Sequence, residues 1–264
     1  MGMTSIVDMA GHQQPRILTV VPARYRSVRF PGKIIAPLAG KPLVAHTYAR
    51  ACEAALSGEV VVATDAPEVA EALAPYDIPV VMTRADHPSG TDRIAEVAAS
   101  RAVDIVVNVQ GDEPLLNPEI IDATVRPLLE DPEVMMSTAR HLIHDPAQIA
   151  NPNSVKVICD ARGRAIYFSR AAIPFIRDAV DREAAPPCYW EHIGLYVYRR
   201  DFLLAYAKMP QTPLEKLEKL EQLRAIENGF PIAVVDTEYE AVGVDTPEDL
   251  ERVAALLASK RQGD

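Results

Sequence analysis

Positively charged side chains are concentrated in one short segment of a chain that is acidic overall. The 264 residues have a formal net charge of −10, yet residues 22–33 read PARYRSVRFPGK and no Asp or Glu occurs between positions 9 and 52. Arg forks and a Lys ammonium match the oxygens of a phosphate chain, and Gly32 lets main-chain N–H groups approach a ligand. The segment therefore predicts a phosphate-binding loop, with an ordinary solvated loop as the alternative.

The common ATP-binding version of such a loop does not fit this sequence. Gly-Lys pairs occur at Gly32-Lys33 and Gly40-Lys41, but neither has a Gly five residues before the Gly. Neither pair is followed by the Ser or Thr that would hold a magnesium ion. A Walker A motif is therefore excluded by its spacing.

Acidic side chains follow a second apolar run and precede the last apolar-periodic segment. NVQGDEP (108–114) places Asp112 and Glu113 after a buried strand, and GVDTPEDL (243–250) places Asp245 before a helix. Mg²⁺ takes few protein ligands, so one or two such carboxylates together with phosphate oxygens would hold it. The alternative is that these residues only cap the helices that follow them. The residues alone leave both interpretations open.

Other candidates carry weaker signals. Arg170 ends the run YFSR and is either a surface charge or a clamp for a carboxylate, while His192 is more often a structural residue. Glu221 and Gln222 interrupt a pattern of Leu and Lys. HLIH (141–144) has the spacing of a metal site, but on a strand residues three apart face opposite sides, so that interpretation is rejected.

The elements that must position these residues alternate between strands and helices in the first half. Continuous apolar runs predict strands at 17–21, 59–64, 78–82 and 104–109, and helical spacing predicts helices at 41–56, 67–76 and 91–101. Such alternation indicates right-handed βαβ units and a mostly parallel sheet covered by helices. Ligands bind at the carboxyl ends of such strands, so the loops at 22–33, 65–66 and 110–114 are candidate site loops.

The second half has a different character. Strands are predicted at 134–143, at 154–170 with a hairpin turn at 161–164, and at 192–200, with a Pro-rich and charged excursion at 174–191. One helix is predicted over 212–229, where Thr212 and Glu215 form a capping box and Gly229 ends it, and another over 246–260.

Composition excludes several classes of protein. No apolar run approaches the ~20 residues of a membrane span, and the first fourteen residues do not resemble a secretory signal. The three cysteines are scattered, which argues against disulfides or a zinc knuckle and fits a cytoplasmic location. The negative net charge argues against nucleic acid and membrane surfaces as partners.

Eight ordered motifs resemble one family over nearly the whole chain. They are PARYRSVRFPGK (22–33), TRADHPSGTDR (83–93), NVQGDEP (108–114), NPNSVKV (151–157), YFSRAAIP (167–174), HIGLYVYRR (192–200), PLEKLEKLEQLR (213–224) and GVDTPEDLERV (243–253). Together they resemble the 3-deoxy-manno-octulosonate (Kdo) cytidylyltransferases of lipopolysaccharide-making bacteria. The resemblance implies a Rossmann-like nucleotide-diphospho-sugar transferase fold, α/β with a mostly parallel sheet flanked by helices and a smaller β-rich dimerisation and sugar-binding part. It also implies a homodimer that couples CMP from CTP to Kdo, with Mg²⁺ as cofactor and pyrophosphate as product.

The same resemblance implies a division of the chain and a set of site residues. After a flexible leader at 1–14, residues 15–264 would form a single cytidylyltransferase domain, with nucleotide binding at about 15–130 and sugar binding and dimerisation at about 131–240. The implied nucleotide-binding residues are Arg24, Ser27, Arg29, Lys33, Arg93 and Gln110. The implied sugar-binding residues are Arg170, His192, Glu221 and Gln222. Lys33, Arg29, Asp112 and Asp245 would carry catalysis, the two aspartates as magnesium ligands.

Some positions depart from the family pattern. Arg26, Val28 and Ile34 differ from it in the basic loop, and Phe175 and Val197 differ from it near the sugar pocket. The departures leave open a Kdo analogue such as 8-amino-Kdo, or another acidic sugar, as the acceptor. A catalytically silent nucleotide-binding relative is a further alternative, against which the presence of Lys33, Asp112 and Asp245 counts.

Overall fold

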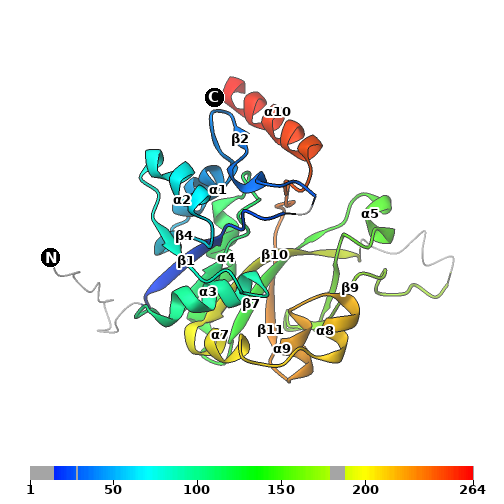
Figure 1. Cartoon of the computed structure of the whole chain (residues 1–264). Helices are drawn as coiled ribbons and strands as arrows, with labels where there is room; N and C mark the ends of the chain where they lie inside the picture. The colour runs from blue at the N-terminus through cyan, green and yellow to red at the C-terminus, as the bar shows by residue number, and fades with distance from the viewer. Residues whose placement is uncertain (1–14, 28, 179–187, 264) are drawn as a thin grey trace.

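The computed structural model describes residues 15–27, 29–178 and 188–263 (Figure 1). The predicted leader, Val28 and part of the predicted excursion at 174–191 lie outside these residues. No helix in the described ranges is long and apolar enough to cross a membrane.

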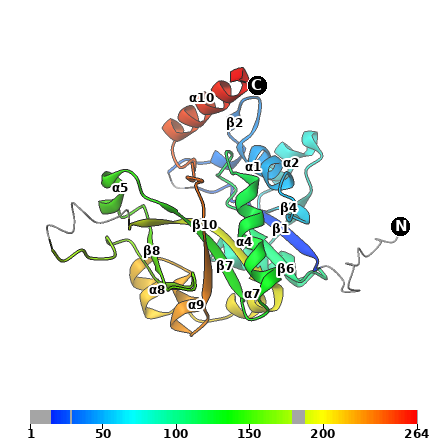
Figure 2. The same cartoon turned by 180° about the vertical axis from the view of Figure 1, so that it is seen from behind.

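In the described residues nine strands join in one mixed sheet, seen from opposite sides in Figures 1 and 2. Its strand order is β11-β7-β10-β6-β1-β4-β5, and β8 pairs with β10 and β9 beside this path. The strands are β1 (Ile17–Pro22), β4 (Glu59–Thr64), β5 (Val80–Met82), β6 (Ile105–Asn108), β7 (Met136–Leu142), β8 (Lys156–Cys159), β9 (Ala165–Ser169), β10 (Trp190–Arg199) and β11 (Ile232–Asp236). β5, β4, β1 and β6 are parallel, as predicted, whereas β10 runs antiparallel between β6 and β7.

Helices cover both faces of the sheet. The helices of the described residues are α1 (Leu43–Cys52), α2 (Pro67–Leu73), α3 (Gly90–Ala99), α4 (Pro118–Glu130), α5 (Pro146–Ala150), α7 (Arg200–Tyr206), α8 (Pro213–Glu218), α9 (Leu223–Glu227) and α10 (Pro247–Gly263). The 3-10 turns η1 (Lys33–Ile35) and η2 (Ala74–Tyr76) and the short hairpin of β2 (Pro37–Leu38) and β3 (Lys41–Pro42) complete the order. α1 and α4 pack on one face of the central strands, and α3 and α7 pack on the other.

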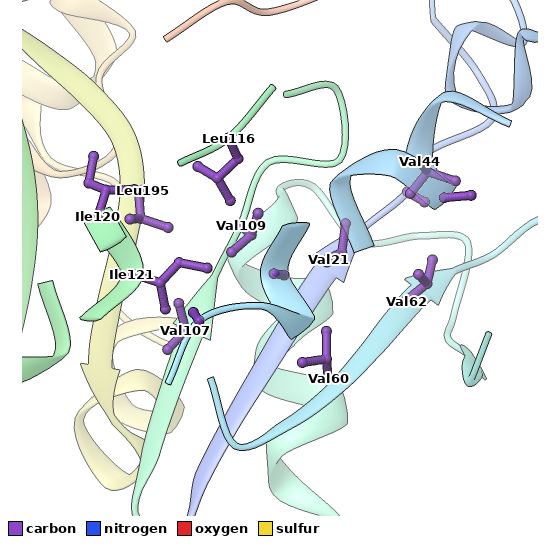
Figure 3. Close-up of a cluster of buried hydrophobic side chains, with 14 of the residues drawn as sticks. Val21, Val44, Val60, Val62, Val107, Val109, Leu116, Ile120, Ile121 and Leu195 are labelled. Carbon is purple, nitrogen blue, oxygen red and sulfur yellow. The ribbon is translucent and has the colours of Figure 1, made fainter. Parts of the chain in front are cut away.

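The two faces follow from the alternation of side chains along each strand. In β4, Val60 and Val62 face α1, while Val61 and Ala63 face α3. Figure 3 shows the first of these clusters, in which Val21 of β1 lies between α1 and the residues that follow β6. Because these central strands are buried on both faces, their sequences read as continuous apolar runs. The strand predictions of the first half are therefore confirmed.

The prediction of one helix over 212–229 is wrong. The segment forms two short helices, α8 and α9, separated at Lys219, whose backbone is left-handed with φ 54°. The leucines of this segment, which a single helix would align on one face, do not share one, because Leu217 is 79% exposed while Leu220 and Leu223 are buried. The start was predicted correctly, since the Glu215 carboxylate accepts a hydrogen bond from the Thr212 N–H.

Candidate active site

Lys33 lies at the centre of a cluster of charges at the carboxyl edge of the parallel strands. It is the first residue of η1, which follows the basic loop after β1. Its Nζ donates to Asp112 Oδ2 at 2.6 Å, to Asp245 Oδ1 at 2.9 Å and to the Val244 carbonyl at 2.9 Å. The Arg29 guanidinium contacts the other oxygen of Asp245 at 2.9 Å. Residues from both ends of the chain thus converge on one ammonium group.

The carboxylates of Asp112 and Asp245 are not helix caps. The N-terminus of α10 is capped by Thr246, whose Oγ1 accepts from the Asp249 N–H at 3.2 Å, and that of α4 is capped by Asn117. Both aspartate side chains instead face Lys33. The capping interpretation left open by the sequence is therefore wrong for these two residues.

The electrostatics of the cluster favour a charged Lys33. Burial disfavours its ammonium, but the carboxylates of Asp112 and Asp245 outweigh that effect, so the pKa of Lys33 is raised. Burial raises the pKa of Glu113 to about 8, and the neighbouring Asp112 adds to that shift. Of the two acidic residues of the QGDEP motif, Asp112 is the one whose side chain contacts Lys33.

A cavity of about 400 Å³ opens beside this cluster. The basic cavity, as we call it, is lined by Pro22, Arg24, Arg26, Ser27, Arg29, Lys33, Ile34, Gly90, Gln110, Gly111, Asp112 and Asp245. It therefore brings together every predicted triphosphate residue of the loop and both predicted metal ligands. Arg26, which belongs to the predicted basic loop but is not among the site residues that the resemblance implies, also lines it.

A second cavity of about 380 Å³ shares Gly90 and Gln110 with the first. We call it the polar cavity; its lining includes Thr91, Asn108, Asn153, His192, Gly194, Tyr196, Lys219, Glu221 and Gln222. One wall is the first half of β10, which extends past the carboxyl end of β6 because Tyr196 pairs with Asn108. Gln110 is fixed between the two cavities, since its Nε2 donates to the Gly194 carbonyl at 3.1 Å.

The polar cavity contains neutral and unpaired polar groups. Burial lowers the pKa of His192 to about 3, so its imidazole is neutral, and its Nε2 lies 2.9 Å from Thr138 Oγ1. Among the described residues, Gln222 Nε2 and Glu221 Oε1 are buried without a hydrogen-bond partner. Buried polar atoms are nearly always satisfied in native proteins, so these two indicate a site that a polar ligand completes.

Two predicted site residues line neither cavity. Arg93 is 1% exposed, and its guanidinium pairs with Asp65 at 2.9 Å and donates to Thr83 Oγ1. Arg170 donates through its guanidinium to the main-chain carbonyls of Pro152, Glu218 and Lys219. Arg170 therefore connects two segments that flank the polar cavity, and its predicted contact with a sugar carboxylate remains a prediction.

Sequence reasoning missed Asn153, Tyr196 and Lys219 on the wall of the polar cavity. Asn153 and Tyr196 stand within the motifs NPNSVKV and HIGLYVYRR, so membership of a motif was their only signal. Lys219 also stands within a motif, PLEKLEKLEQLR, but a continuous helix would have placed it on an ordinary charged face. Its left-handed backbone at the break between α8 and α9 is what brings it to the cavity.

The paired aspartates suit a magnesium ion. In the part of the chain that the structure describes, no cluster of three or more His, Cys, Asp or Glu side chains could form a complete metal cage. Mg²⁺ typically takes one or two carboxylate ligands from the protein, while substrate phosphates and water supply its other ligands. Two carboxylates that converge on one point, as these do on the Lys33 ammonium, meet that requirement. The donor set of Asp112 and Asp245 therefore fits Mg²⁺.

Comparisons with known proteins define first the class and then the family. The family model described as cytidylyltransferase matches residues 18–238, so the chain is a nucleotidyltransferase of that class. It is 55% identical to the 3-deoxy-manno-octulosonate cytidylyltransferase of Solibacter usitatus over 94% of this chain and 97% of the relative. It is 51% identical to that of Geobacter metallireducens over 92% and 98%. The chain belongs to the 3-deoxy-manno-octulosonate cytidylyltransferase family.

Solved structures agree with this assignment. The CMP:2-keto-3-deoxy-manno-octonic acid synthetase complexed with CTP superposes with a TM-score of 0.87 and 41% identity, over 93% of this chain and 99% of that one. A cytidylyltransferase from Leptospira borgpetersenii, 18% identical with a TM-score of 0.61 over 93% and 88%, shares the fold alone. The predicted family, fold class and enzyme class are confirmed.

Proposed function

We propose that this chain transfers CMP from CTP to Kdo with release of pyrophosphate, the step that activates Kdo for lipopolysaccharide synthesis. The observation that carries the proposal is the pair of adjoining cavities, one basic and one polar, which meet at Gln110 and Gly90. A nucleoside triphosphate in the basic cavity and a sugar in the polar cavity would have their reacting groups side by side. The relatives named for this activity supply the identities of the two substrates.

The reaction needs positioning and charge neutralisation more than covalent chemistry. The anomeric hydroxyl of the sugar attacks the α-phosphorus of CTP, the bond to the β-phosphate oxygen breaks, and pyrophosphate leaves. Negative charge develops on the transferring and leaving oxygens, which Arg29 and Lys33 are placed to stabilise. Arg24 and Ser27 bind the same phosphate chain from the opposite part of the loop.

Asp112 and Asp245 would hold Mg²⁺, which when bound supplies positive charge to the phosphates between the substrates. In the structure, Lys33 neutralises both carboxylates and Arg29 neutralises one of them. A triphosphate would offer these two cations other anionic partners, which would leave Asp112 and Asp245 available to hold the metal.

The polar cavity is suited to a sugar with many hydroxyl groups. Gln222 Nε2 can donate to such a hydroxyl and Glu221 Oε1 can accept from one, since neither atom has a hydrogen-bond partner among the described residues, although Glu221 Oε1 lies 3.9 Å from the Arg224 guanidinium. The neutral imidazole of His192 adds a further polar contact without adding charge. We also propose, from the family resemblance, that the protein works as a cytoplasmic homodimer; light scattering after gel filtration tests the dimer.

The decisive experiment measures pyrophosphate release from CTP and Mg²⁺ with and without Kdo. We expect release that depends on Kdo and on the metal, and that is nearly abolished by Asp245→Asn. A panel containing 8-amino-Kdo and a sialic acid in place of Kdo distinguishes the acceptor sugars. Absence of Kdo-dependent release would refute the proposal, and preferential turnover of another acid would replace Kdo as the substrate.

A further inference from the structure

Lys156, near the polar cavity, is completely buried. Its residue exposure is 0%, although lysine is among the residues least often buried without a partner. Its ammonium donates to two main-chain carbonyls, that of Asn151 at 2.9 Å and that of Ser154. Burial lowers the pKa of Lys156, while the nearby Glu191 opposes that shift. A buried ammonium of this kind must compensate its lost hydration through the carbonyls that it binds.

Those carbonyls belong to a tight turn at 151–154. The turn is closed by the Ser154 N–H, which donates to the Asn151 carbonyl at 3.2 Å, and by the Asn153 N–H, which donates to Asn151 Oδ1 at 3.0 Å. The Pro152 carbonyl accepts from Arg170 at 2.8 Å. Three carbonyls of the turn are therefore bound by cations, while the exposed Asn153 lines the polar cavity.

Val155, the residue between the turn and Lys156, connects the turn to the wall of the polar cavity. The Val155 carbonyl accepts from the His192 N–H at 2.8 Å, and both residues line the polar cavity. Lys156 itself lines neither cavity. It is linked to the cavity wall through the main chain that it holds and through Glu191, its partner in the pairing of β8 with β10, which lines the cavity.

We propose that Lys156 is a positioning residue for the acceptor sugar, which holds Asn153 and the adjoining main chain in the geometry that binds it. This inference rests on the proposed function, because it takes the polar cavity to be the sugar site. Lys156 makes no contact with the sugar and acts through Asn153, Val155 and His192. Loss of the ammonium removes a donor from the Ser154 carbonyl and leaves the Asn151 carbonyl with the Ser154 N–H, so the turn can rearrange, whereas the basic cavity keeps its residues.

The test compares Lys156→Met with the matched control Lys208→Met, whose lysine is exposed. Met keeps the apolar stem and removes the donors. In the pyrophosphate assay we expect the KM for Kdo to rise about tenfold or more in Lys156→Met, with the KM for CTP within about twofold of the wild type. Lys208→Met leaves both constants unchanged.

Asn153→Ala gives an independent readout on an exposed residue that leaves the fold intact. It is expected to raise the KM for Kdo selectively, and the double variant is expected to show less than the product of the two single effects, because the residues act as a unit. An unchanged KM for Kdo in either single variant overturns the inference, as does a change in thermal stability without a selective effect on Kdo. If the wild type shows no Kdo-dependent release, the proposed function itself fails.

Discussion

The buried pair of Glu215 and Arg224 is expected to be a major contributor to stability around the polar cavity. Arg224 Nε donates to Glu215 Oε2 at 2.9 Å and its NH2 donates to the other carboxylate oxygen, with side-chain exposures of only 7% and 5%. The pair joins α8 to α9 across the break that carries Glu221 and Gln222. The substitution Glu215→Gln keeps the shape of the side chain but removes the carboxylate that the buried guanidinium contacts directly, and leaves Glu221, at 3.9 Å, as the nearest carboxylate.

The expected magnitude follows from this geometry. Removal of one partner from a buried ion pair typically costs about 3–5 kcal/mol, and the amide of Gln, which can keep one hydrogen bond, places this case at roughly 3 kcal/mol. For a chain of more than 150 residues each kcal/mol corresponds to about 2–4 °C, so the Tm is expected to fall by roughly 6–12 °C. The KM for Kdo should rise as well, since the pair supports the wall of the polar cavity.

Differential scanning calorimetry and urea unfolding measure the effect. The matched control is Asp86→Asn, which breaks the exposed pair of Arg84 and Asp86, whose side chains are 69% and 76% exposed. The control is expected to change the free energy of unfolding by less than about 0.5 kcal/mol, because solvent already screens that pair. A Tm for Glu215→Gln within 1–2 °C of the wild type, on the order of the control, would refute the reasoning from burial.

Three further predictions concern the two cavities. Lys33→Met is expected to weaken CTP binding. In the absence of nucleotide it is expected to strengthen the binding of Mn²⁺, which substitutes for Mg²⁺. Electron paramagnetic resonance measures the Mn²⁺ binding, and weaker Mn²⁺ binding in the variant would contradict the prediction. Because burial lowers the pKa of His192 from its ordinary value to about 3, the neutral imidazole contributes stability that is complete above about pH 6.5 and is lost as the pH falls toward 3. His192→Gln should therefore reduce the fall in Tm between pH 7 and pH 5, and an NMR titration showing the His192 ring protonating near pH 6.5 would count against this. Gly111→Ala is expected to impair CTP binding, since its Cβ would lie 2.7 Å from the Pro22 carbonyl oxygen. Calorimetric titrations with CTP measure the effect. Gly243→Ala, with open space around its Cβ, serves as the control.

The central sheet could be predicted from the sequence because its signals are local. A strand buried on both faces reads as an apolar run whatever lies around it, so 17–21 and 59–64 matched β1 and β4 closely. The meeting of the basic loop with Asp112 also followed, since loops at the carboxyl ends of parallel strands share one edge, whereas Asp245 was placed there by the family resemblance. What the residues left open was whether Asp112 and Asp245 cap helices, because the choice of cap depends on contacts between neighbouring side chains.

The break at Lys219 depends on contacts that are distant in sequence. Arg170 binds the carbonyls of Glu218 and Lys219 from 48 and 49 residues away, and the Glu218 carboxylate accepts from the Arg170 N–H. The spacing of the leucines gives no information about such a distant partner. The same limit applies to Arg93, whose burial against Asp65 could not be read from its place in a charged motif.

The contact between Lys33 and Asp245 spans 212 positions of the chain. A ribosome adds residues in order, so the basic loop is made 212 residues before its second carboxylate. The growing chain therefore holds the cations of the loop long before the charge cluster around Lys33 is complete. With the role proposed above for Asp245, we expect a chain that stops before this residue to be inactive.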